Sequence, residues 1–367
     1  MKVVGIICEY NPFHNGHLYH LEKAKEIADG GIIIAILTGY FSMRGDVSVI
    51  NKYQKVKAAI DNGVDITIEL PFLLGTQNAD IFAYNSVKLL SMMGVNDIVA
   101  GSESNDINII NNISNFEDDK EFNDEIKRNL DIGLSYRKSY TNALEKYNIT
   151  LSSNDMLNVK YLKAIKQIKP EITLHLIKRI NNNYNDETLN NTNIQSATAI
   201  RKATDIKEYV PEFINDIFVE KGFYDIESFK GVLKHLLLTQ NLNNVFEAKE
   251  GIENSFKITF KSIDELIDKL ATKRYTKTRI RRFIAYTLTQ TTKDEMLELN
   301  NDIIRVTGFN QKGQKYLSTI KKDTNYFTRL INGINKIYDK ELMIAKIFSN
   351  IYNEDFIKIE QSLPYKK

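Results

Sequence analysis

The sequence predicts an α/β protein, with a Rossmann-like, doubly wound parallel sheet followed by a mainly α-helical C-terminal domain. Short runs of apolar and β-branched residues alternate with helical patterns through residues 1–205. One run, residues 31–37, is apolar without interruption, which is typical of a parallel strand buried on both faces. From residue 206 apolar residues recur at helical spacing and strand-like runs nearly vanish. We therefore divide the chain into residues 1–205 and residues 206–367.

The first strand and the turn after it carry the most informative side chains. An apolar run over residues 3–7 precedes a turn rich in Asn, Pro and Gly, and a helix reaches to about Ala28. His14 and His17 lie between them with Gly16. A strand, a tight turn and a helix N-terminus together form a phosphate-binding geometry, and two imidazoles can donate hydrogen bonds to phosphoryl oxygens. A pair of loop histidines is more often satisfied by local backbone, but this context favours nucleotidyl transfer.

The next segments continue the alternation of strand and helix. Strand patterns cover residues 31–37, 64–71 and 95–103, and helical patterns cover residues 52–61 and 78–93. The loop at residues 38–46 follows a strand's carboxyl end, where open parallel sheets bind ligands. Arg44, Asp46 and Lys52 are therefore site candidates, with a structural salt bridge as an equally weighted alternative. Gly101 would let a base or ribose pack against backbone, or would only permit a positive φ.

Residues 106–205 complete the predicted α/β series. Residues 106–168 are expected to be mostly helical, with a helix N-cap near Ser152, and residues 172–179 return to a strand pattern. An Asn-rich loop, Asn181–Asn193, then leads to the SATAIR segment at residues 196–201. Ser196 and Thr198 begin a further helix there.

The second half of the chain is expected to bind RNA. Residues 273–282 hold six basic residues and no acidic one, with Tyr275 among them, and residues 309–315 form a second basic turn before a helix that ends in Lys321 and Lys322. A short charge run is more often a solvated helix face, but two such clusters favour contacts with RNA phosphates. A short strand is expected at residues 256–259. The predicted RNA contacts are Lys273, Arg274, Lys277, Arg279, Arg281 and Arg282.

The composition excludes several classes of protein. Hydrophobic residues at 43% and charged residues at 26% are typical of an ordinary globular protein. The single cysteine, Cys8, excludes a disulfide within the chain and fits a reducing cytoplasm. No apolar run reaches the ~20 residues that span a bilayer, so we expect no membrane association. No Cys/His constellation predicts a metal site, and neither a protein partner nor an oligomeric state is indicated.

The motifs resemble those of a known superfamily. HNGH after a first strand is similar to the signature of the HIGH-type nucleotidyltransferases, and SATAIR resembles their second element, a Ser/Thr-rich turn that ends in a basic residue. The order of motifs along the whole chain resembles the bacterial tRNA(Met) cytidine acetate ligase family. The matching stretches are GIICEYNPFHNGHLYH, GYFSMRGDVSVINK, GVDITIELPF, GSES, SNDML, IKRINNNY and SATAIR. One departure is Ala100, where that family usually has Phe.

The resemblance implies an activity and a set of site residues. The chain would activate acetate with ATP, with Mg²⁺ as the expected counter-ion, and would transfer the acetyl group to N4 of the wobble cytidine of elongator tRNA(Met). The implied catalytic residues are His14, His17, Ser196, Thr198 and Arg201. The implied nucleotide contacts are Ile7, Cys8, Glu9, Tyr10, Asn11, Pro12, Phe13, His14, Asn15, Gly16, His17, Leu18, Tyr19, His20, Gly101, Asn154 and Arg179.

Two other functions remain open at this point. The first is an adenylyltransferase that joins AMP to a small phosphorylated cofactor precursor, although such enzymes are usually shorter and lack a large basic helical half. The second is a non-catalytic RNA-binding protein that keeps the nucleotide fold as a scaffold. The intact HNGH and SATAIR stretches argue against the second alternative.

Overall fold

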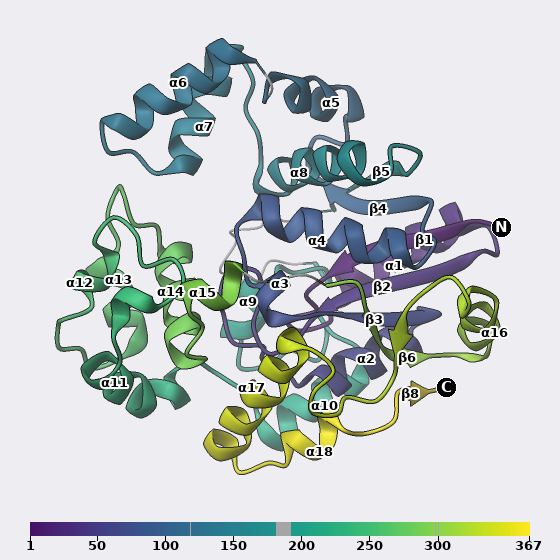
Figure 1. Ribbon diagram of the computed structural model, residues 1–367. Helices are drawn as coiled ribbons and strands as arrows, with labels where there is room; N and C mark the ends of the chain where they lie inside the picture. Colours follow the sequence, from purple (N-terminus) through teal and green to yellow (C-terminus); the bar gives the residue numbers. More distant parts are fainter. Residues whose placement is uncertain (118, 181–191, 298, 300) are drawn as a thin grey trace.

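The computed structural model describes residues 1–117, 119–180, 192–297, 299 and 301–367. Within these ranges the strands form one mostly parallel sheet in the order β5-β4-β1-β2-β3-β6-β7, and β8 pairs with β6 (Figure 1). The predicted Asn-rich loop lies outside the described residues at positions 181–191. The strands are β1 (Val3–Cys8), β2 (Ile32–Thr38), β3 (Ile66–Leu70), β4 (Asp97–Ser102), β5 (Thr173–Lys178), β6 (Ile304–Phe309), β7 (Tyr326–Phe327) and β8 (Tyr365–Lys366).

The order of the strands locates the crevice of the sheet. Strands β1 to β5 are parallel, and β1 lies between β2 and β4. The strand order reverses at β1, which makes the carboxyl ends of β1 and β4 the switch point where doubly wound sheets bind ligands. The turn with the two histidines follows β1, and Gly101 lies near the end of β4.

Helices cover both faces of this sheet. In the first half they are α1 (Asn15–Ala28), α2 (Lys52–Asp61), α3 (Phe72–Gly75), α4 (Ala79–Met92), α5 (Ile107–Phe116), α6 (Lys120–Asp131), α7 (Tyr136–Glu145), α8 (Ser153–Ile168) and α9 (Ala197–Lys202). In the second half they are α10 (Glu212–Lys221), α11 (Lys230–Thr239), α12 (Ile252–Ser255), α13 (Ile263–Leu270), α14 (Lys277–Leu288), α15 (Lys293–Leu297), α16 (Gln311–Ile320), α17 (Lys336–Tyr352) and α18 (Phe356–Glu360), with short 3-10 turns at Glu227–Phe229 and Leu242–Asn244. None of the helices in these described ranges is long and apolar enough to cross a membrane.

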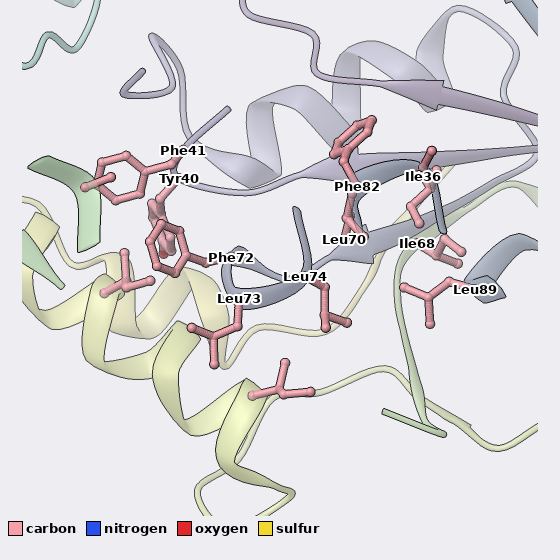
Figure 2. Packing of buried hydrophobic residues seen from close by; sticks show 14 of the residues in the cluster. Ile36, Tyr40, Phe41, Ile68, Leu70, Phe72, Leu73, Leu74, Phe82 and Leu89 are labelled. Atoms are coloured by element: carbon pink, nitrogen blue, oxygen red, sulfur yellow. The ribbon is translucent and has the colours of Figure 1, made fainter. Parts of the chain in front are cut away.

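The uninterrupted apolar run of β2 is explained by its two buried faces. Ile34 and Ile36 belong to one core cluster, whereas Ile33 and Leu37 belong to the cluster on the other face. Alternate side chains of a strand point to opposite faces, so both faces must be covered by helices to bury the whole run. Figure 2 shows Ile36 beside Ile68, whereas Phe72 and Leu73, which follow β3, lie near a helix of the second half.

The second half is less purely helical than the sequence predicts. The strand expected at residues 256–259 is wrong: Phe256 follows the last turn of α12, and its ring is buried against Phe283 at 4.8 Å between ring centroids. Strand β6 pairs antiparallel with β3 and so extends the sheet, and the short strands β7 and β8 pair with β6. The sequence pattern did not identify β6 as a strand, because its pairing with β3 depends on a partner distant in the chain. The division at residues 205 and 206 stays a prediction, while one core cluster includes residues of both halves.

Candidate active site

A cavity of about 570 Å³ opens at the carboxyl ends of the parallel strands. Its volume falls within the range of pockets that hold small molecules and cofactors. Most of the predicted nucleotide contacts and all five predicted catalytic residues line it. These lining residues are Ile7, Cys8, Glu9, Tyr10, Asn11, His14, Gly16, His17, Tyr19, His20, Gly101, Asn154, Arg179, Ser196, Thr198 and Arg201. Ala100, the departure from the family pattern, also lines the cavity.

Four predicted contacts shape the turn and do not line the cavity. Phe13 and Leu18 pack in the core beneath it. The backbone N–H of Asn15 donates to Tyr209 O at 2.9 Å, and its side-chain amide donates to Glu208 O at 2.8 Å. Pro12 follows a cis peptide bond. These residues hold the segment that carries the two histidines and are not placed to touch a ligand in the cavity.

The two histidines cap the first helix with their own side chains. Nδ1 of His14 accepts a hydrogen bond from the Gly16 N–H at 3.0 Å, and Nδ1 of His17 accepts one from the His14 N–H at 3.2 Å. An imidazole nitrogen that accepts from a backbone N–H carries no proton, so the proton of each neutral ring lies on Nε2. Each histidine therefore has one N–H donor that its helix cap leaves available for a ligand.

Gly16 is required at its position by the neighbouring imidazole. A Cβ there would lie 2.8 Å from His14 Cε1, which is closer than real contacts allow. The histidine rings are themselves closely packed, with 3.8 Å between the centroids of His14 and His17 and 4.8 Å between those of Tyr10 and His17. The absence of a side chain at Gly16 thus lets His14 cap the helix.

The histidines that line the cavity are neutral at physiological pH. Burial lowers the pKa of His14 to about 3 and the pKa of His20 to about 4, with Arg179 reinforcing both shifts. Burial, together with the charges of the neighbouring histidines, also holds the pKa of His17 well below its usual value. Neutral donors stabilise charge that develops in a transition state without placing a full charge in the cavity.

The SATAIR segment is brought to the first turn from about 190 residues away. Ser196 caps α9 by accepting from the Ala199 N–H at 3.0 Å. Arg201 donates to Asn11 O at 2.7 Å and to Thr198 Oγ1 at 3.1 Å. These contacts place a guanidinium and a hydroxyl beside the turn that follows β1, so a triphosphate in the cavity would meet donors from both motifs.

Glu103, which we did not single out as a site residue, positions two predicted nucleotide contacts. Its Oε1 accepts from Asn154 Nδ2 at 2.5 Å and lies 3.7 Å from Arg179 Nε, and its Oε2 accepts from the Ser152 hydroxyl. Ser152 in turn caps α8. The sequence signal was the GSES stretch that contains Glu103. The carboxylate therefore connects the end of β4, the start of α8 and the end of β5.

The site candidates Arg44, Asp46 and Lys52 lie in different surroundings. Arg44 lines the cavity. Asp46 pairs with Arg281 at 3.2 Å. Lys52 lies outside the cavity and pairs with Glu341 at 2.5 Å and with Glu360 at 2.9 Å. The structural reading holds for Lys52, since its ammonium group is enclosed by carboxylates from both halves of the chain.

The predicted RNA contacts fall into two groups. Arg274, Arg279 and Arg282 line the cavity, whereas Lys273, Lys277 and Arg281 do not. Acidic residues that the sequence analysis did not connect with this segment neutralise part of it. Glu250 pairs with Arg279 at 2.6 Å and lies 3.6 Å from Arg274, and Glu247 pairs with Arg282 at 2.9 Å.

The acidic side chains of the site determine whether the protein itself could supply ligands to Mg²⁺. In the described part of the chain, no group of three or more His, Cys, Asp or Glu side chains could hold one. The carboxylates nearest the cavity are engaged: Asp80 pairs with Lys160 at 2.9 Å, and Glu9 accepts from the Met43 N–H at 2.6 Å. We therefore assign no protein ligand to Mg²⁺.

Comparisons with known proteins agree with this geometry. A family described as HIGH Nucleotidyl Transferase matches residues 1–362. The tRNA(Met) cytidine acetate ligase of Caldicellulosiruptor bescii is 38% identical, over 99% of this chain and 97% of that protein. The enzyme of the same name from Fusobacterium nucleatum is 36% identical, over 96% and 93% of the two chains. A crystal structure of Thermotoga maritima TmcAL bound with alpha-thio ATP is 26% identical, covers 100% of both chains and superposes with a TM-score of 0.86.

Proposed function

Because this chain belongs to the HIGH nucleotidyl transferase family and, within it, to the family of the tRNA(Met) cytidine acetate ligases, we propose that it acetylates the wobble cytidine of elongator tRNA(Met) with acetate and ATP. The observation that carries the proposal is the pair of neutral imidazoles, His14 and His17, whose helix cap leaves both Nε2 donors available in the cavity. Arg201 adds a permanent positive charge beside them.

The first step activates acetate. A carboxylate oxygen of acetate attacks the α-phosphorus of ATP, the bond from that phosphorus to the bridging oxygen of the β-phosphate breaks, and pyrophosphate leaves. Negative charge gathers on the phosphoryl oxygens, where His14, His17 and Arg201 would donate hydrogen bonds. Ser196 and Thr198 would add hydroxyl donors for the leaving pyrophosphate. The product is acetyl-adenylate, a mixed anhydride.

The second step transfers the acetyl group. The exocyclic N4 of cytidine attacks the acetyl carbon, the bond from that carbon to the AMP oxygen breaks, and N4 loses one proton. The anhydride is already activated, so positioning the amine supplies much of the acceleration without a strong general base. Asn154, Arg179 and Gly101 would hold the nucleotide at the ends of β4 and β5 during both steps.

The proposal also includes Mg²⁺, ATP, the acceptor tRNA and a cytoplasmic location, each with its own support. Mg²⁺ would reach the cavity with the triphosphate, because this ion is usually held by substrate phosphates and water. The crystal structure with alpha-thio ATP supports ATP as the nucleotide, and the relatives' names support tRNA(Met) as the acceptor. A reducing cytoplasm fits the free Cys8 thiol.

The test is transfer of labelled acetate to elongator tRNA(Met), with ATP present or omitted. We expect ATP-dependent label in tRNA, and acetate-dependent exchange of pyrophosphate into ATP. His14→Ala should lower both rates by about 10²–10³-fold, the usual cost of losing one donor to developing charge. His235→Ala is the matched control, because His235 lies on α11 and does not line the cavity.

Each alternative predicts a different result. A dinucleotide product that forms without tRNA would establish an adenylyltransferase of small cofactor precursors. Neither exchange nor transfer, together with tight tRNA binding that survives His14→Ala, would establish a non-catalytic RNA-binding protein. Exchange with another small acid would keep nucleotidyl transfer and remove acetate from the proposal.

A further inference from the structure

The cavity has a wall to which the proposed chemistry assigns no role. This wall comes from the start of α7 and its N-cap, in the helical segment between β4 and α8, and not from the strand ends or turns that carry most of the predicted nucleotide contacts. The first turn of α14 and the residues just before it line the same cavity. Figure 1 shows α7 and α14 on the same side of the sheet, in two separate groups of helices. The wall from α7 consists of Ser135, Tyr136, Arg137 and Tyr140, and the wall from the α14 segment consists of Arg274, Thr276, Thr278, Arg279 and Arg282.

Tyr136 presents an aromatic ring at the first position of a capped helix. Ser135 caps α7 through its side chain, so the start of the helix is fixed. Tyr136 is 51% exposed, although it lines the cavity, and its ring centroid lies 6.1 Å from that of Tyr140, which is 1% exposed. An accessible ring backed by a buried one on a rigid element is suited to stacking on a flat ligand.

Arg137 connects this wall with the predicted nucleotide end of the cavity. Its guanidinium donates to Ser153 Oγ at 2.9 Å. Ser153 is the first residue of α8 and directly precedes Asn154, which Glu103 holds toward the nucleotide end. A group that stacks on Tyr136 would thus lie in the same continuous cavity as the activated nucleotide.

The arginines of the α14 segment favour an anionic ligand in the cavity. Arg274, Arg279 and Arg282 line the cavity; their partner Glu250 is 47% exposed, whereas Glu247 and Arg282 form a mostly buried pair. Phosphates of a polyanion can replace the exposed carboxylate of Glu250 at Arg274 and Arg279, because surface ion pairs are weak. Cations for a phosphate chain on one wall and an aromatic ring on the other are the combination that binds single-stranded RNA.

We propose that the wall formed by Ser135, Tyr136 and Arg137 is the subsite for the target cytidine, which stacks on the Tyr136 ring while the flanking phosphates contact the arginines of the α14 segment. This proposal rests on the proposed function. An enzyme that modifies a base must receive that base unstacked from its neighbours, and an aromatic side chain replaces the lost stacking. The cytosine ring that stacks on Tyr136 directs its exocyclic amine along the cavity toward the acetyl-adenylate.

The test compares two rates in the same variants. Acetate-dependent exchange of pyrophosphate into ATP needs no tRNA, whereas acetyl transfer does. For Tyr136→Ala we expect the ratio of transfer to exchange to fall by roughly 5–100-fold, the usual range for a lost base–aromatic stack. Tyr136→Phe should keep the ratio, since the ring remains. Tyr84→Ala is the control, because Tyr84 is 43% exposed on α4 and does not line the cavity.

Each other outcome overturns the proposal in a distinguishable way. An unchanged ratio in Tyr136→Ala would remove the ring from RNA binding. Equal loss of exchange and transfer would place Tyr136 at the nucleotide instead. If the ratio of transfer to exchange fell in Tyr136→Phe as well, the hydroxyl and not stacking would explain the loss. If the wild-type protein showed neither rate, the proposed function itself would fail, and this inference with it.

Discussion

At the scale of single residues, Glu103 positions two of the side chains that we expect to contact the nucleotide. Glu103 accepts from Asn154 at 2.5 Å and lies 3.7 Å from Arg179 Nε, so one carboxylate orients both predicted nucleotide contacts. It does not itself line the cavity. We regard it as a positioning residue, whose loss should weaken nucleotide binding more than it slows the chemical step.

Glu103→Gln keeps the size of the side chain and removes its charge. We expect the KM for ATP in the exchange reaction to rise by about 10-fold with a smaller change in kcat, because a charge-assisted contact contributes roughly 1.5–3 kcal/mol. Glu26→Gln is the control, since Glu26 lies on the exposed face of α1 and pairs with Lys23 at 2.7 Å. A fall in kcat at unchanged KM would show that Glu103 acts on the reaction and not on binding.

The lowered pKa values of the cavity histidines couple stability to pH. The pKa of His20 is lowered from 6.5 to about 4, so between these values the unfolded chain binds more protons than the folded chain. The stability from His20 is complete above pH 6.5 and is lost as the pH falls toward 4. We expect His20 alone to lower the free energy of unfolding by roughly 2 kcal/mol between pH 7 and pH 5.

Urea unfolding at the two pH values checks this. His20→Asn should show a smaller loss on acidification than the wild-type protein, because it removes one group that must gain a proton. His235→Asn, on α11, should match the wild-type protein. Identical losses in all three proteins would contradict the assignment of this pH dependence to His20.

At the scale of elements, the close approach of α16 to the sheet depends on one glycine. A Cβ on Gly313 would lie 2.1 Å from Asp65 O, a backbone atom that cannot move like a flexible side chain. The same oxygen accepts from the Asn310 N–H at 3.1 Å, and Asn310 caps α16. Helix α16 therefore starts against the segment that leads into β3.

A pair of glycine substitutions should change stability in opposite directions. Gly313→Ala should lower the free energy of unfolding by about 1–3 kcal/mol through overpacking. Gly231→Ala should raise it by about 0.5–1 kcal/mol, because Gly231 lies in α11 with no atom within 4 Å of an added Cβ, and alanine is the better helix former. Urea unfolding measures both, and a Gly313→Ala protein as stable as the wild-type protein would contradict the close packing of α16.

At the scale of the whole molecule, a buried charge cluster connects the two halves of the chain. Lys52 on α2 and Glu69 on β3 meet Arg305 on β6, Glu341 on α17 and Glu360 on α18. Three carboxylates thus share two cations. Burial raises the pKa of Glu341 to about 7, whereas the neighbouring cations lower that of Glu360 to about 2 against the effect of burial.

Lys52→Met should lower the free energy of unfolding by about 3–5 kcal/mol at pH 8, because it leaves buried carboxylates with a single cation. Lys57→Met on the same helix is the control and should cost about 0–1 kcal/mol, since the Lys57–Asp61 pair is about one-third exposed. The deficit of Lys52→Met should shrink as the pH falls toward 7, because loss of the Lys52 charge raises the pKa of Glu341 further and its carboxylate gains a proton in the variant first. Equal effects of both substitutions would contradict a central role for the cluster.

The sequence alone determined the features that local pattern specifies. Apolar runs of strand length located β1 to β5, and the HNGH and SATAIR stretches located the residues that line the cavity, because periodicity and turn chemistry are local properties. Motif order along the chain also placed the protein in its family. The predicted roles of those site residues remain predictions.

The tertiary structure decided what depends on partners distant in the chain. It made β6 a strand by pairing it with β3, and it placed Lys52 in a charge cluster and not in the cavity. It also showed that Glu103 holds Asn154 and that Tyr136 and three arginines of the α14 segment line one cavity. Such contacts join residues tens to hundreds of positions apart, and their energy comes from burial and charge that no local pattern encodes.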